Sequence, residues 1–177
     1  MGCPEDLLKL AQDIADLNPL EPAHQACLRR AVSTAYYAIF HLLLSEATAN
    51  WARPELRAIL ARCFDHGPMK TASETKISQI NSASKQRPSA NPANSVTGNL
   101  MTVATAFVQA QQRRIDADYN MLKEWTPVEV YTHVASVGEA FKAWNMIRDE
   151  AEAQAYLVSL LGNKERRQSE LKAAAKG

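Results

Sequence analysis

The sequence predicts an all-α protein, an antiparallel bundle of four or five helices. Glycine is scarce, at 6 of 177 residues, against a usual share of about 7%, and no glycine dipeptide typical of a β-hairpin occurs. Apolar residues recur at steps of three and four along most of the chain, which is the period of a helix with one buried face. Long helices with short connections pack as antiparallel neighbours.

Proline delimits the first two helices. We expect the first over residues 4–17, because Pro4 begins it and Asn18-Pro19 follows. The second is expected from about residue 21 to Ala49. Its predicted buried face consists of Leu28, Val32, Ala35, Ile39 and Leu43.

The middle of the chain is less regular. A third helix is predicted over residues 54–64, closed by His66-Gly67-Pro68. A short, weaker helix is expected from about Thr71, which has capping-box spacing to Glu74. Residues 83–95 contain almost nothing to bury and are predicted to form a mobile loop.

The last two helices are the longest. The fourth is expected over residues 96–125, and Thr126-Pro127-Val128-Glu129 then combines an N-cap, a proline at the first helical position and a glutamate at the third. The fifth is expected to reach Leu161, before Gly162-Asn163. Its predicted buried face consists of Val130, Val134, Val137, Phe141 and Trp144. Residues 1–162 are therefore expected to form one bundle, and residues 163–177 are expected to form a basic, frayed or disordered tail.

Charge and composition exclude several classes of protein. Lys+Arg number 20 and Asp+Glu 19, so a nucleic acid or other polyanion would have to bind at a local patch. No apolar run approaches the length of a membrane span, and Glu5 and Asp6 stand where a secretory signal would be basic and then apolar. We therefore expect a cytoplasmic protein with no membrane partner, and its odd number of cysteines fits reduced thiols. No phosphate loop or nucleophile elbow is present, and no cofactor is predicted.

Three segments in the helices carry recognisable motifs. The second helix reads Arg29-Arg30-Ala31-Val32-Ser33-Thr34-Ala35-Tyr36-Tyr37-Ala38-Ile39-Phe40-His41, and the fourth contains Arg114-Ile115-Asp116-Ala117-Asp118-Tyr119. Between them lies Phe64-Asp65-His66-Gly67. In this order, the three segments resemble the HEPN domain family of prokaryotic helical bundles, and the resemblance spans most of residues 5–160.

The resemblance implies a four- or five-helix bundle that forms a homodimer. Many HEPN domains are metal-independent ribonucleases of toxin-antitoxin, abortive-infection or CRISPR-linked defence systems. Active members have an Arg, four to six intervening residues, and a His, and the two motifs of a dimer meet in one cleft. The imidazole moves the 2′-OH proton, and the guanidinium stabilises the charge that develops on the phosphate.

The histidines of this chain do not have that spacing. His24, His41 and His133 have no arginine four to eight residues upstream, and only three residues separate Arg62 from His66. In the fourth helix, Asp118 and Tyr119 follow Arg114 where a catalytic histidine would be expected.

The same segments suggest a binding surface. Two pairs of consecutive arginines, Arg29-Arg30 and Arg113-Arg114, are here called the double-arginine steps. They could form a phosphate-binding patch, or they could pair with acidic residues on a solvated helix face. Tyr36, Tyr37 and Phe40 could stack on bases, although their neighbours favour core packing. The candidate binding residues are Arg29, Arg30, Arg113, Arg114, Asp118, Tyr119 and Tyr37.

Two further sets of residues could form a site, one catalytic and one for zinc. His41 follows Arg30 by eleven residues, so both lie on one side of the helix, and an alternative catalytic set across a dimer is Arg30, His41, Arg114 and His66. Each Cys-His pair at one-turn spacing could contribute half of a zinc site, whereas cysteine is also a common buried residue. The zinc candidates are His24, Cys27, Cys63 and His66.

We therefore predict a HEPN-like binding or regulatory module of a prokaryotic stress, toxin-antitoxin or defence system, without ribonuclease activity. Its ligand would be RNA, a nucleotide or a partner protein from a neighbouring gene. One alternative is a divergent endoribonuclease toxin with a site shared across the dimer. Another is a structural subunit of a larger defence assembly.

Overall fold

The computed structural model describes residues 2–16, 24–86 and 95–161. The helices are α1 (Cys3–Ala15), α2 (His24–Ala49), α3 (Arg57–Ala61), α4 (His66–Gln86), α5 (Val96–Tyr119), α6 (Pro127–Ile147) and α7 (Ala151–Ser159), with a 3-10 turn, η1 (Pro54–Leu56), before α3. No strand occurs in these three ranges. The prediction of an all-α protein is therefore confirmed.

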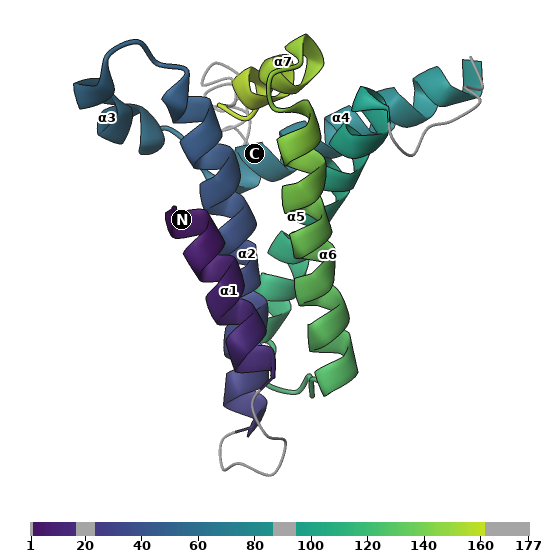
Figure 1. Ribbon diagram of the computed structural model, residues 1–177. Helices are drawn as coiled ribbons and strands as arrows, with labels where there is room; N and C mark the ends of the chain where they lie inside the picture. Colours follow the sequence, from purple (N-terminus) through teal and green to yellow (C-terminus); the bar gives the residue numbers. More distant parts are fainter. Residues whose placement is uncertain (1, 17–23, 87–94, 162–177) are drawn as a thin grey trace, which may run out of the picture.

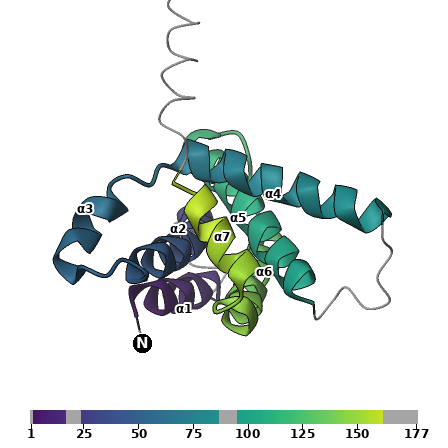
Figure 2. The ribbon, with the colours of Figure 1, turned by 90° about the horizontal axis from the view of Figure 1, so that it is seen from above.

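Four helices form the body of the molecule. Helices α1, α2, α5 and α6 run alongside one another in alternating directions (Figure 1). Helix α4 crosses one end of this bundle, packs on α5 and extends beyond it, while α7 covers the same end (Figure 2). The short η1 and α3 project sideways from the end of α2. None of the described helices is long and apolar enough to cross a membrane.

The predicted apolar faces of α2 and α6 form the core. Every residue named above for these two faces is buried. Trp144 of α6 is fully buried, as are Tyr36 and Ile39 of α2 and Phe107 of α5. The hydrophobic period therefore identified the packed faces correctly.

The capping signal before α6 is also confirmed. The Thr126 hydroxyl accepts a hydrogen bond from the Glu129 backbone N–H at 3.3 Å, and the Glu129 carboxylate accepts one from the Thr126 N–H at 2.9 Å. Pro127 occupies the first helical position, where its missing N–H costs nothing.

The predictions around α4 were wrong. His66-Gly67-Pro68 does not end a helix but begins α4, and Thr71 lies within α4 and not at its cap. Proline is tolerated there because the first-turn N–H groups of a helix have no intrahelical partners. Helix α4 also includes residues 83–86, which were assigned to a loop, while 87–94 lie outside the described residues.

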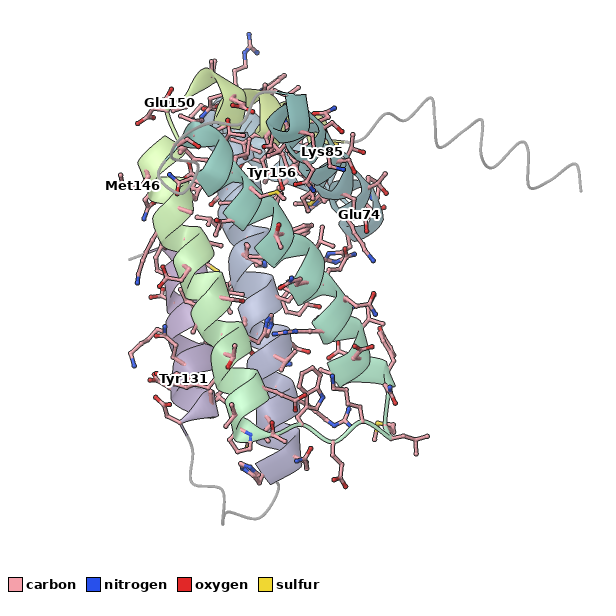
Figure 3. The ribbon with its side chains drawn as sticks, turned by 90° about the vertical axis from the view of Figure 1, so that its right-hand side faces the viewer. Glu74, Lys85, Tyr131, Met146, Glu150 and Tyr156 are labelled. Atoms are coloured by element: carbon pink, nitrogen blue, oxygen red, sulfur yellow. The ribbon has the colours of Figure 1, made fainter. Side chains whose placement is uncertain are left out.

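Three other helix boundaries differ from the prediction. The third helix divides into η1 and α3, and the fourth ends at Tyr119 instead of residue 125. The fifth is interrupted between Ile147 and Ala151, so that α7 can pack its Tyr156 toward α4 (Figure 3), where its hydroxyl lies 2.7 Å from the buried Ser73 hydroxyl. The proposed ends at Asn18-Pro19 and Gly162-Asn163, and the tail 163–177, lie outside the described residues.

Candidate functional site

The three motif segments converge where α2, the start of α4 and α5 meet. The Tyr36 hydroxyl is hydrogen-bonded to Nδ1 of His66, the first residue of α4. Gln111 of α5 donates from Nε2 to the His66 carbonyl at 3.0 Å. The Phe40 ring lies 4.5 Å from the His66 ring between centroids. Side chains of α2 and α5 thus fix the position of the His66 imidazole.

Burial sets the protonation states of this hydrogen bond. It raises the pKa of Tyr36 above its usual value, so that the phenol keeps its proton and donates. Burial, with Arg114 as the next contribution, lowers the pKa of His66 below its usual value of 6.5. His66 is therefore neutral at pH 7, and its Nδ1 accepts.

A second imidazole lies on the same side of α2. The rings of His41 and His66 both lie 6.5 Å from the Tyr37 ring. Burial lowers the pKa of His41 below its usual value as well. Two neutral imidazoles therefore lie near one half-buried tyrosine, Tyr37.

Arg114 completes this cluster from α5. Its Nη2 donates to the Tyr37 hydroxyl at 3.2 Å, and its Nε lies 2.7 Å from a carboxylate oxygen of Asp118. The other Asp118 oxygen accepts a hydrogen bond from Ser33 of α2. The guanidinium also lies over the ring of Tyr119, 5.6 Å from its centroid. Tertiary packing thus brings a guanidinium and two imidazoles together, although their spacing in the sequence separates them.

The other arginines of the double steps have different surroundings. Arg29 donates to the carbonyls of Ala117, Asn120 and Lys123 at 2.8, 3.0 and 2.5 Å, where α5 ends. Arg113 lies near α6. Burial, with the charge of Arg113 as the next contribution, lowers the pKa of His133, and hydrogen bonds to Thr126, with a small contribution from Arg113, lower the pKa of Glu129. Arg30 is exposed and makes no ion pair with the described residues.

An open groove of about 520 Å³ lies between the start of α2 and the end of α5. Its lining residues are Ala26, Arg29, Arg30, Ser33, Ala117, Asp118, Tyr119 and Met121. Tyr119 is 69% exposed and presents its ring to solvent. The groove therefore holds four of the predicted binding residues, which include a cation without a described ion-pair partner (Arg30), an exposed aromatic ring (Tyr119) and a carboxylate (Asp118).

The predicted zinc ligands do not come together. Among residues 2–16, 24–86 and 95–161, no three His, Cys, Asp or Glu side chains are placed to hold a metal ion. The imidazole of His66 is instead held by Tyr36, and Cys63 is exposed. The spacing of His24 and Cys27 reflects only their position on one helix.

Two residues of the cluster were missed by the sequence analysis. Ser33 lies one helical turn before Tyr37, and Gln111 lies one turn before Arg114. Polar residues at this spacing share a face with the motif residues, and that spacing was the available signal. Gln111 is buried, which is unusual for a glutamine and marks it as part of the network.

Comparisons with known proteins give no assignment: no family model, curated protein or solved structure matches the chain.

Proposed function

We propose that the protein is a HEPN-like module that binds single-stranded RNA in the groove between α2 and α5 without cleaving it. The observation that carries the proposal is the groove lining, to which Arg30, Asp118 and Tyr119 all contribute. A cation, an acceptor and an exposed ring are the groups that recognise a nucleotide.

Each of these groups has a part in binding. Arg30 is free to contact a phosphate, because no described carboxylate pairs with it. Tyr119 offers a stacking surface, with the Arg114 guanidinium beside the same ring. Asp118 can accept from a ribose 2′-OH or a base N–H, since each carboxylate oxygen has a second lone pair beyond its bond to Ser33 or Arg114.

The same contacts argue against cleavage. Asp118 compensates the charge of Arg114, the group that would stabilise a negatively charged transition state. Both His41 and His66 have lowered pKa values and are neutral at pH 7. A neutral imidazole can accept a proton, but cleavage also needs an acid to protonate the leaving oxygen.

Fluorescence anisotropy with a labelled single-stranded RNA tests the proposal. We expect Arg30→Glu to weaken binding by about tenfold or more, because it replaces a phosphate contact with a repulsion. Tyr119→Ala removes the stacking surface and should weaken binding by a similar factor. Arg62→Glu is the matched control, since it makes the same charge change at α3, away from the groove. Equal losses for Arg30→Glu and Arg62→Glu would show only a general charge effect and reject the groove.

A second candidate is a metal-independent endoribonuclease. It is favoured by the proximity of His41 and His66 to Tyr37, whose hydroxyl accepts from Arg114. His41 could act as the base while Arg114 stabilises the phosphate. Incubation of labelled RNA with the protein in EDTA distinguishes the candidates. Cleavage that is lost in both His41→Gln and Arg114→Gln, but kept in Arg62→Glu, would replace the binding proposal with this one.

A further inference from the structure

The segment that connects α2 to α4 projects from the bundle and exposes apolar side chains. Residues 51–62, here called the arm, comprise Trp51 and the residues through η1 and α3 to Arg62. None of the residues in η1 or α3 is buried, and α3 packs mainly on α2 and η1. The arm projects away from the bundle in both views (Figures 1 and 2). The arm is therefore accessible to a partner that does not contact the bundle.

The arm is apolar at positions where a surface helix is usually polar. Trp51 is 49% exposed and Ile59 is 62% exposed, and Leu56 lies one turn before Ile59 on the same side of the helix. Only Leu60 packs against the core. These three side chains leave much of their apolar surface in solvent.

The charge of the arm is positive. It contains Arg53, Arg57 and Arg62 but one acidic residue, Glu55. Arg57 donates to the carbonyls of Ala49 and Trp51 and so fixes the base of the arm. Arg53 and Arg62 make no ion pair within the described part of the chain. Two free guanidinium groups therefore accompany the apolar side chains.

We propose that the arm docks on an anionic lipid surface, a peripheral contact that departs from the expected absence of a membrane partner. Tryptophan and aliphatic side chains enter the interfacial region of a bilayer, while arginines contact the acidic headgroups. Leu56 and Ile59 favour lipid over RNA, because an aliphatic side chain offers no ring on which a base can stack. The arm is also convex and projecting, a shape that a bilayer accepts without a complementary groove.

The protein contains its own probe for this contact. Of its three tryptophans, Trp125 and Trp144 are buried, and only Trp51 is exposed. With vesicles of equal parts phosphatidylcholine and phosphatidylglycerol, we expect Trp51 emission to shift to shorter wavelength and to become protected from acrylamide. Vesicles of phosphatidylcholine alone should give much less of either change.

Co-sedimentation with the same vesicles measures the contribution of each group. Each arginine near an anionic surface contributes about fivefold in affinity, so Arg53→Glu with Arg62→Glu should weaken binding by at least about 25-fold. Ile59→Asp should weaken it by about tenfold. Leu122→Asp and Arg30→Glu are matched controls at the opposite end of the bundle and should bind as the original protein does. Circular dichroism confirms that each variant is folded.

Several results would overturn the proposal. Absence of binding to the anionic vesicles would reject it, as would equal binding to phosphatidylcholine alone or binding that survives the arm substitutions. Quenching of Trp51 by RNA, lost in the arm variants, would assign the arm to RNA. Loss of a co-purifying protein in those variants, with no vesicle binding by the original protein, would assign it to a protein partner. Because Arg30→Glu affects only the RNA groove, the two proposals can fail separately.

Discussion

The two double-arginine steps look alike in the sequence but have different roles in the structure. In α2, Arg29 turns inward to the carbonyls that end α5, and Arg30 faces the open groove. In α5, Arg114 turns toward Tyr37 and Asp118, while Arg113 lies near α6. Consecutive residues of a helix point about 100° apart, so one member of each pair has an internal partner.

An arginine is available for a ligand only when neither backbone carbonyls nor nearby carboxylates already bind its guanidinium. Arg29 donates to main-chain carbonyls, and substitution of a neighbouring side chain leaves these acceptors in place. Arg114 is held by a carboxylate, which a single substitution can remove. Arg30 has neither kind of partner among the described residues. The three should therefore respond differently to mutation.

The largest effect is expected beside Arg113, at His133 of α6. Its ring is fully buried, and neither nitrogen makes a well-formed hydrogen bond to the described residues. Burial, with the charge of Arg113, lowers its pKa from 6.5 to about 4, and a contact with the Val32 backbone opposes this shift only in part. Protonation therefore favours the unfolded chain. The stability is fully present above pH 6.5 and is lost as the pH falls toward 4, by about 3 kcal/mol for this group.

Urea unfolding of the original protein and of His133→Leu across this pH range measures that loss. The variant should keep its stability at pH 7, because leucine removes two unpaired buried nitrogens, and should lose less stability on acidification. Subtracting the free energies of unfolding of the two proteins at each pH removes the contribution of the carboxylates, because both proteins share them. Parallel pH profiles would contradict the assignment to His133.

An intermediate effect is expected from Arg29→Ala. The change leaves the carbonyls at the end of α5 without their charged donor, and we expect a loss of about 2 kcal/mol in the free energy of unfolding. Arg30→Ala is the matched control one residue away and should change stability by less than about 0.5 kcal/mol. Thermal or urea unfolding of both variants gives the comparison. Similar losses would mean that the two arginines do not differ as described.

The smallest effect on stability is expected from Asp118→Asn. This change removes the charge opposite Arg114 but keeps an acceptor for Ser33, so the loss should be about 1 kcal/mol for a partly exposed pair. If the groove binds RNA, removal of a negative charge should also strengthen binding by a few-fold. Anisotropy and urea unfolding test the two effects separately. Weaker RNA binding in this variant would indicate that Asp118 contributes an essential contact.

The candidate site could be predicted only in its parts. The sequence placed Tyr37 and His41 on one helix and Arg114 and Asp118 on another, because these relations depend on helical spacing alone. It named His66 only in the alternative catalytic set across a dimer and assigned it to a helix end instead of the start of α4, and it did not name Gln111, which donates to the His66 carbonyl. Both depend on where α4 begins and on which helices it packs against.

Local interactions explain what the sequence alone determined. This applies to the buried faces of α2 and α6 and to the cap at Thr126. Each depends on side chains within one or two helical turns of one another, so its pattern can be read from the sequence. Other features depend on partners far apart in the chain. These are the proximity of Arg114 to His41 and His66, the hydrogen bonds from Arg29 to the end of α5, and the projection of the arm. Only the packed structure decides these, because a side chain's charge and accessibility are set by the groups that surround it.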